Sequence, residues 1–512
     1  MNDRAKPSVE ADDLIRLATL LRNRSRILRQ LEARRRVRKN ERLQMLGVGF
    51  RGDLDRIIEK NRNLIMFLLR SALDINPALG EASALLAELH YEAGETAEAL
   101  ELIERSRAFP GQDHAMTVLY GQALLETHSS EALPYFARIV EADTSALELV
   151  RLFDVHGFDQ WSERVGGRPV GLGGADKDVV GSLRVSLEGT VHEIDNTFRQ
   201  TPLVGAAIND LEIVGGVVPV VEGQGYYDLA HLSGLAGQAG VTGRSRTAIV
   251  ARNDIPKVTI EEPCILAMAS PSYYQNYFHA IGQIYARIVM ALDHLPDADS
   301  YSVLLPSSTP TWGRTFLEMV GIPAERLRFI PVDRRVVVKK ALVLPMKWDV
   351  CPSEIEALRA RLTIRFPYQN ARRSYFLLRD GANNITRRLA NEEDFIASAR
   401  RHGFATLNPM RYTLPEQADL FRGTARMVIP ASSAYANMVF APPGGEVCMI
   451  APRLFWGSLS SDLATSCSQR FSVIFGEYLA GSRNIASPHH AFVADPAALD
   501  RLLALSETGT PV

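Results

Sequence analysis

The sequence has few cysteines and no long, purely apolar run. Its 512 residues contain only four cysteines and no CxxC pair, so we expect neither a structural zinc site nor a disulfide framework. Two long stretches, residues 264–286 and 427–445, lack charged side chains, but both contain polar residues and the second contains prolines. Bare polar groups are unfavourable in lipid. We therefore predict buried segments around a site rather than transmembrane helices.

The charges are balanced, with 57 Lys and Arg against 59 Asp and Glu and a net charge of −2. A dedicated nucleic-acid-binding protein normally carries a basic excess, so nucleic acid is not an expected partner. The polar amino terminus lacks the apolar run of a secretory signal. We expect a cytoplasmic protein that is at most peripheral at the inner membrane face. No HExxH, GxSxG or Walker A motif is present.

Residues 1–60 read as a basic amphipathic helical segment. Between residues 14 and 42 there are eleven Lys and Arg against two acids, and Leu14, Leu21 and Leu28 follow a seven-residue spacing. The pattern fits a helix with one apolar seam and a basic face. Three interpretations stay open: a solvated helix packed on the next domain, a short coiled coil, or a surface attracted to anionic lipid.

Residues 61–160 read as an α-helical domain. Two similar units place Ala99 and Ala132 33 residues apart. The pattern resembles tetratricopeptide repeats, whose period is about 34 residues, and an ordinary helical bundle is the alternative. Either reading predicts contact with a protein partner, or self-association, through these helices rather than chemistry.

From residue 165 onward the sequence pattern changes. Glycine-rich turns with short β-branched runs come first, and alternating helical and strand patterns follow. Such alternation predicts parallel sheets with crossover helices. We expect an α/β fold of two doubly wound Rossmann-like halves, residues 165–350 and 351–512, facing a cleft. Ligands of such sheets bind at the carboxyl ends of the strands.

Two clusters carry the candidate chemistry. The first, in NYFHAIGQIYAR, contains Asn276, His279, Gln283 and Arg287, and on a helix the first three would share one face. This fits a site that faces a cleft, and a satisfied core histidine is the alternative.

The second cluster, in YFLLRDGANNITRRLANEEDF, places Arg379 at a strand end and Arg387 and Arg388 before a helix that begins near Asn391 and Glu392. Guanidinium groups bind phosphate oxygens in pairs, and a helix amino terminus adds N–H donors, so an anion site is predicted. The alternative is that Asn391 and Glu392 only cap the helix.

Together with EQADLFRGTARMVIPASSAYANMVFAPPGGEVCMI, these segments resemble glycosyltransferase family 61 over roughly residues 165–475. The resemblance implies a GT-B-like, inverting enzyme that moves a sugar from a nucleotide-sugar donor to a glycan acceptor, with bacterial relatives in surface polysaccharide biosynthesis. It departs where the usual acid after the histidine is Gln283, where HGAGLTN reads ASSAYAN, and where the usual acid of the last strand is Met449.

On this resemblance, His279 is the base or acceptor-orienting residue, and Gln283 is its hydrogen-bonding neighbour. Asn276 and Arg287 are placed on the acceptor side or in a structural role. Donor binding is predicted for the following residues: Arg379, Arg387, Arg388, Asn391, Glu392, Ser432, Ser433 and Asn437. No cofactor and no metal are expected, because arginines and helix ends can supply the charge that a diphosphate needs. The alternative function is a catalytically degenerate relative that acts as a binding or scaffold subunit.

Overall fold

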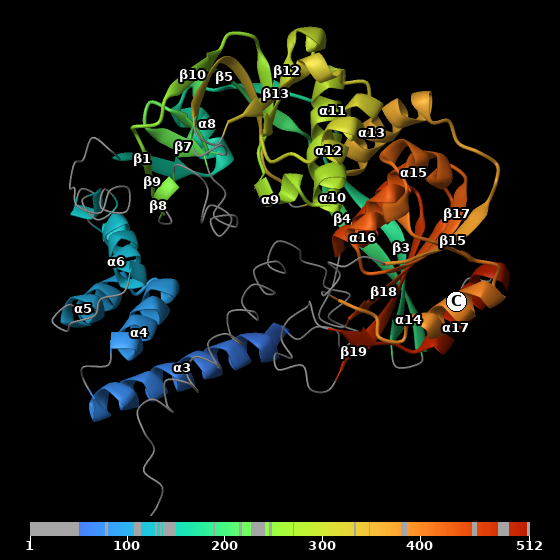
Figure 1. Cartoon of the computed structure of the whole chain (residues 1–512), viewed down its shortest axis with the longest axis horizontal. Coiled ribbons are helices and arrows are strands. Elements are labelled where there is room, and N and C mark those ends of the chain that lie inside the picture. Colours follow the sequence, from blue (N-terminus) through green and yellow to red (C-terminus); the bar gives the residue numbers. More distant parts are fainter. Residues whose placement is uncertain are drawn as a thin grey trace, which may run out of the picture. The chain divides into compact units, whose positions relative to one another are not determined.

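The computed structural model describes most of the chain in two compact units (Figure 1). The described residues are 51–76, 80–106, 114–127, 131–133, 136, 150–187, 190–214, 218–226, 241–244, 248–269, 271–331, 334–347, 349–379, 387–452, 458–479 and 491–508. Unit 1 comprises residues 1–165, 212–258 and 332–335, and unit 2 comprises 166–211, 259–331 and 336–512. Most of the predicted basic segment 1–60 lies outside the described residues.

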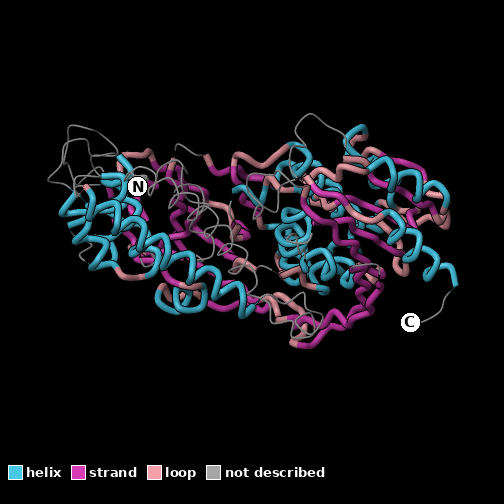
Figure 2. The backbone as a smooth tube through the Cα atoms, turned by 90° about the horizontal axis from the view of Figure 1, so that it is seen from below, coloured by secondary structure: helices cyan, strands magenta, loops and turns pink. Residues whose placement is uncertain are grey.

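Unit 1 begins with consecutive helices, which are labelled in Figure 1 and drawn in cyan with the other helices in Figure 2. They are α3 (Arg51–Ile75), α4 (Gly80–Ala93), α5 (Thr96–Ser106) and α6 (His114–Thr127), and each contacts the next. Gly94 has a φ of +84°, a conformation that glycine adopts without strain, and it turns the chain between α4 and α5. These helices confirm the predicted amino-terminal helical region.

A group of strands completes unit 1. The strands are β1 (Val150–His156), β6 (Val218–Val221), β7 (Gln224–Tyr226), β8 (Val241–Arg244) and β9 (Ala248–Arg252), with α8 (Phe158–Arg164) alongside. Buried side chains of α4, α5 and α6 pack in one cluster with Val150 and Val250, so helices and strands share a core. These strands were not predicted as part of the helical region, because they come from residues far apart in the sequence.

Unit 2 contains a first parallel set of strands in the order β13-β12-β11-β14. Their bounds are Cys264–Ala267 (β11), Ser302–Pro306 (β12), Leu327–Ile330 (β13) and Arg335–Leu344 (β14). β11 and β12 are buried at every residue, the pattern of strands covered on both faces. In chain order the strands lie 3-2-1-4, so the order reverses between β11 and β14.

Helices and further strands accompany this first set. They are β2 (Arg168–Gly171), β5 (Val204–Val214), β10 (Lys257–Ile260), α9 (Pro271–Tyr274), α10 (Tyr277–His279), the π-helix η4 (Ala280–Tyr285), α11 (Ala286–His294), η5 (Ala298–Ser300), α12 (Thr311–Met319), η6 (Ala324–Arg326) and α13 (Pro352–Arg365). Pro352 stands at the start of α13, where its missing N–H costs no helical hydrogen bond.

The second sheet of unit 2 has the order β16-β15-β17-β18-β19-β3-β4. Its strands are Arg373–Leu377 (β15), Ala405–Leu407 (β16), Thr424–Pro430 (β17), Glu446–Pro452 (β18), Arg470–Tyr478 (β19), Lys177–Leu187 (β3) and Thr190–Gln200 (β4), with β20 (Phe492–Val493) beside β19. The first five are parallel and lie 2-1-3-4-5 in chain order, so the order reverses between β15 and β17.

The helical elements of this second half are α14 (Glu392–Arg401), η7 (Pro409–Arg411), α15 (Leu414–Phe421), η8 (Ser433–Phe440), α16 (Ser458–Ser466) and α17 (Pro496–Thr508). The start of α15 is determined by local sequence. In α15, Thr413 and Glu416 form a capping box, with Glu416 accepting from the Thr413 backbone N–H at 2.7 Å.

The β3–β4 hairpin comes from residues 177–200, within the range predicted as the amino-terminal half, yet β3 pairs with β19 in the second sheet. Figure 1 shows these two green strands beside the orange and red strands. Asn196 of β4 donates to Asp462 of α16 at 3.3 Å, and a Cβ on Gly181 would lie 2.0 Å from Oγ1 of Thr465. Strand pairing therefore does not follow the predicted division at residue 350.

The mixed α/β architecture with two sheets and an amino-terminal helical region agrees with the sequence prediction. Within the described ranges, no helix combines the length and the apolar character needed to cross a membrane. The charge-free stretches become β11 with the helical segment that follows it, and β17 with η8.

Candidate active site

The His279 segment follows the carboxyl end of β11 and contains an irregular helix. α10 passes into the π-helix η4 and then into α11. The Tyr274 hydroxyl donates to the Ala267 carbonyl at 2.6 Å, which ties the start of the segment to the end of β11. Short π-helical turns are rare and often occur at functional sites. The periodicity of the sequence predicted a regular helix here and did not predict this turn.

His279 and Gln283 form a hydrogen-bonded pair. Nδ1 of His279 lies 2.6 Å from Oε1 of Gln283, and an amide oxygen only accepts, so Nδ1 carries the proton. That tautomer leaves Nε2 with the lone pair that a general base needs. The imidazole also stacks on the Tyr273 ring, with centroids 4.3 Å apart and planes at 11°. The ring orientation is therefore held from two sides.

The helical spacing predicted that Asn276 shares a face with His279 and Gln283, and the structure gives Asn276 a capping role. It is the N-cap of α10, and its Oδ1 accepts from the backbone N–H groups of Phe278 and His279, at 3.1 and 3.4 Å. This bonding is typical of asparagine at a helix start. Asn276 thus positions the backbone of His279.

The neighbouring Tyr277 connects this segment to the second sheet. Its hydroxyl donates to Oδ1 of Asn437 at 2.6 Å, and the Asn437 amide donates to Oε1 of Gln417 at 2.9 Å. Asn437 is fully buried in η8, the segment that follows β17. Burial raises the pKa of Tyr277 far above its usual value, so the phenol stays a donor. This hydrogen bond joins Asn437, one of the predicted donor residues, to the His279 segment.

Arg287 lies in a buried charged cluster. Its side chain is 1% exposed and donates to the Pro345 carbonyl at 2.6 Å, while its Nε lies 3.7 Å from the carboxylate of Glu354. Glu354 is fully buried and also lies 3.7 Å from Nζ of Lys347. Burial raises the pKa of Glu354, and the two cations oppose that shift. These buried contacts, just beyond the carboxyl end of β14, favour a structural role for Arg287.

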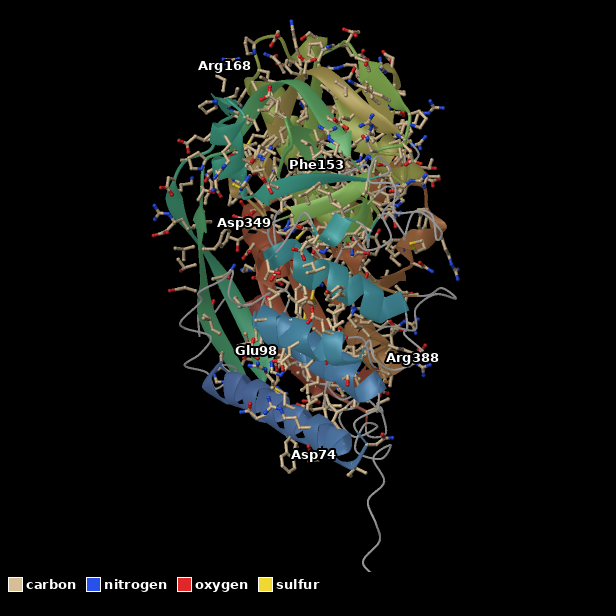
Figure 3. The ribbon with its side chains drawn as sticks, turned by 90° about the vertical axis from the view of Figure 1, so that its left-hand side faces the viewer. Asp74, Glu98, Phe153, Arg168, Asp349 and Arg388 are labelled. Carbon is tan, nitrogen blue, oxygen red and sulfur yellow. The ribbon has the colours of Figure 1, made fainter. Side chains whose placement is uncertain are left out.

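Arg379 and Arg387 lie together after β15. Nη1 of Arg379 donates to the Arg387 carbonyl at 3.0 Å, and burial lowers the pKa of Arg379, against the opposing charge of Glu392. Arg387 has a φ of +57°, an unusual conformation for a bulky residue. Arg388 is exposed, as its labelled side chain shows in Figure 3. The structure therefore groups Arg379 with Arg387.

The α14 amino terminus differs from the predicted anion site. Asn391 is at the N-cap position but makes no capping hydrogen bond, and its amide instead donates to the Ala494 carbonyl at 2.9 Å. The first turn already contains Glu392, Glu393 and Asp394, which occupy the positive end of the helix with negative charge. An incoming anion would therefore depend on the arginines and not on this helix end.

Ser432 and Ser433 follow β17, the strand beside β15. The Ser432 hydroxyl accepts from the Ala434 N–H at 3.1 Å and caps η8, and Ser433 is half-buried as the first residue of that helix. Because β15 and β17 are parallel neighbours, Arg379 and Ser432 lie at the same edge of the sheet, where the strand order reverses.

Residues 277–448 match the sequence model of the family described as Glycosyltransferase 61. The matched range spans 172 of the 512 residues, and over this range the chain is similar to that family. Residues 64–122 match the Tetratricopeptide repeat model, which covers parts of α3 and α6 and all of α4 and α5. No curated protein matches the chain. The comparisons agree with both resemblances found in the sequence, and the family indicates a glycosyltransferase.

The glycosyltransferase 61 match begins at Tyr277 and includes His279, Arg379, Ser432 and Asn437. Sequence reasoning missed Tyr277 and Glu354. Tyr277 stands inside the NYFH string that drew attention to His279, so its position was a usable signal. Glu354 gave none, because it looks like an ordinary acid in the first turn of a helix.

Tyr277→Phe is expected to lower the free energy of unfolding by about 1–3 kcal/mol, because it leaves the buried Asn437 oxygen without its hydroxyl donor. Chemical denaturation measures the change. Tyr375→Phe in β15 is the matched control, since it removes a hydroxyl and keeps the ring contact with Phe421. Equal stability of the two variants would contradict the role of the Tyr277–Asn437 bond.

Proposed function

We propose that the protein is an inverting, GT-B-like glycosyltransferase that transfers a sugar from a nucleotide-sugar to a glycan acceptor, in the cytoplasm and in bacterial surface polysaccharide synthesis. The strand orders 3-2-1-4 and 2-1-3-4-5 support two doubly wound sheets, each with a reversal point where a ligand can bind. Residues 165–350 would form the acceptor side and 351–512 the donor side, with the β3–β4 hairpin as an addition to the donor-side sheet.

The donor would bind at the carboxyl ends of β15 and β17. Arg379 and Arg387 would hold the diphosphate, because guanidinium groups match phosphate oxygens and stabilise the charge of the leaving group. Ser432 and Ser433 lie at the end of the neighbouring strand and would contact the nucleotide or sugar. Arg388, which is exposed, would contribute only at the rim. This arrangement needs no metal, since two guanidiniums supply positive charge.

The acceptor hydroxyl would lose its proton to His279. An inverting transfer needs a base on the acceptor, and a neutral imidazole accepts a proton near neutral pH without a large pKa shift. Gln283 takes the place of the usual acid and holds the Nδ1–H tautomer, so that Nε2 accepts the proton. Gln283 would thus orient the base without itself exchanging a proton.

One observation carries the proposal: the 2.6 Å hydrogen bond from Tyr277 to Asn437. It joins the segment after β11, which contains His279, to the segment after β17, which contains Ser432 and Ser433. The bond supports the proposal that the segments with the predicted base and donor residues meet at one site. The helical repeats of unit 1 would bind a protein partner or a second copy of the chain.

Arg379→Ala is expected to weaken nucleoside diphosphate binding by about 1.5–3 kcal/mol, since it removes a charge-assisted contact. A thermal-shift screen of UDP, GDP, ADP and dTDP would first select the best ligand, and calorimetry would then compare the variant with its parent. Arg401→Ala is the matched control, because Arg401 pairs with Asp500 at the other end of α14.

If Arg379→Ala and the control bind the selected nucleotide with equal affinity, the donor site lies elsewhere. If the parent protein binds a nucleotide-sugar but neither transfers nor slowly hydrolyses it, the protein is a degenerate binding subunit. That result would overturn the proposed activity and leave the donor site standing.

A further inference from the structure

A cavity of about 300 Å³ opens at the amino-terminal edge of the second sheet, the edge opposite Arg379 and Ser432. Arginines from three separate segments contribute to its wall. The lining residues are Arg372, Ser374, Ala425, Arg426, Gly444, Glu446 and Arg470. None of them belongs to the site described above, and all lie within unit 2.

Strand register places the lining side chains in one row. Ser374 of β15 pairs with Arg426 of β17, Arg426 with Glu446 of β18, and Glu446 with Arg470 of β19. Residues in register on parallel strands direct their side chains to the same face of the sheet. The row therefore brings four polar side chains to one face, and Arg372 stands just before β15.

The cavity has an excess of positive charge, with three arginines and one carboxylate. Glu446 pairs with Arg470, whose side chain is still 54% exposed. Arg426 donates to Ser374 and to the His402 carbonyl, both at 3.0 Å. The second bond caps the carboxyl end of α14. Arg372 is exposed and forms no ion pair with any residue in the described ranges. Arg372 and Arg470 can thus direct N–H groups to a ligand.

The backbone of Arg372 supplies a second, independent observation. Its φ is +39°, in the left-handed region that favours glycine. A bulky residue there costs stability, and such strain is often found where a side chain is needed for function. Nothing in the packing requires an arginine at this turn, because its side chain is exposed.

We propose that this cavity binds the oxyanion of a small acidic sugar ligand, either a sugar phosphate or a sugar carboxylate, between Arg372 and Arg470. Both groups present two or more oxygens to a planar guanidinium, which suits paired hydrogen bonds. The volume lies at the lower end of the range for small-molecule pockets, so a single sugar unit is the expected size. The proposal stands independently of the proposed transfer reaction.

The test is calorimetry on the full chain with glucose 1-phosphate and glucuronate, and with glucose as the neutral control. We expect one of the two acids to bind, glucose not to bind, and Arg372→Gly to weaken the binding about tenfold or more. Glycine suits the backbone at this position, so the melting temperature of the variant should stay near that of the parent. Glu446→Gln should tighten binding, because it removes the competing carboxylate.

Arg379→Ala separates this cavity from the proposed donor site. If the acid binds here, Arg379→Ala leaves its affinity unchanged while it weakens nucleoside diphosphate binding. Three results would overturn the proposal: neither acid binds, a folded Arg372→Gly variant binds like the parent, or Arg379→Ala abolishes the binding of the same acid. The better of the two acids identifies the ligand as phosphate or carboxylate.

Discussion

The His279→Ala variant is expected to lose about 100-fold or more in turnover while its affinity for the nucleotide donor stays close to that of the parent. The reason is geometric: the 2.6 Å bond to Gln283 fixes the proton on Nδ1 and leaves Nε2 as the proton acceptor. Removing the imidazole removes the base but not the arginines after β15. Steady-state kinetics and calorimetry on one purified variant measure both quantities.

Gln283→Glu tests the His279–Gln283 pair by changing the partner of the imidazole. A carboxylate beside the imidazole favours its charged form, so the pKa of His279 should rise and the pH–rate profile should move to higher pH. Turnover should be kept or mildly increased at the pH optimum. Tyr273→Leu is a useful companion, because it removes the stacked ring and leaves the hydrogen bond.

The competing view treats His279 as a core residue. It requires that His279→Ala lowers the melting temperature and that the protein that stays folded turns over at the parental rate. That pair of results would remove His279 from the mechanism and assign the base to another residue.

Arg287→Ala is expected to be the most destabilising single change in unit 2. It should lower the free energy of unfolding by about 3–5 kcal/mol. The substitution removes the donor to the Pro345 carbonyl and one of the two cations beside the fully buried Glu354. Arg361→Ala on α13 is the control. Its pair with Asp293 is 25% and 34% exposed, and exposed pairs contribute about 0–1 kcal/mol.

The stability lost in the Arg287→Ala variant should increase with pH. Burial raises the pKa of Glu354 in the folded protein, so its protonated form stabilises the fold at low pH, and this contribution is lost as the pH rises through the folded pKa. Removing Arg287 raises that pKa further. The free energy of unfolding should be measured for variant and parent at about pH 5 and about pH 8, and the difference between them should be larger at the higher pH. The double variant Arg287→Ala, Glu354→Gln should lose this pH dependence, and a deficit that is constant with pH in both variants would contradict the interpretation.

Local chemistry made much of the fold predictable. Buried runs such as those of β11 and β12 appear in the sequence as apolar segments, and α15 begins at a readable capping box. The groups that meet across long separations were not predictable. Glu354 meets Arg287 only because α13 packs on α11, and its burial leaves no periodic signal.

The candidate site was predictable to a similar degree. Ordered motifs led to His279, Gln283 and Arg379, and the structure brings His279 and Gln283 together. The capping role of Asn276 and the π-helical turn depend on backbone detail that residue spacing does not encode. The bond from Asn391 to the Ala494 carbonyl likewise depends on a distant part of the chain.

The β3–β4 hairpin has a consequence for how the chain is made. β3 leaves the ribosome long before β19, its partner in the sheet, so the hairpin must wait until residues 470–478 have been synthesised. Until then, β3 presents an open strand edge of the kind that chaperones cover and that pairs wrongly with other chains. For the same reason, a fragment cut at residue 351 would leave β19 without β3, so the two halves should be produced as one chain rather than as separate pieces.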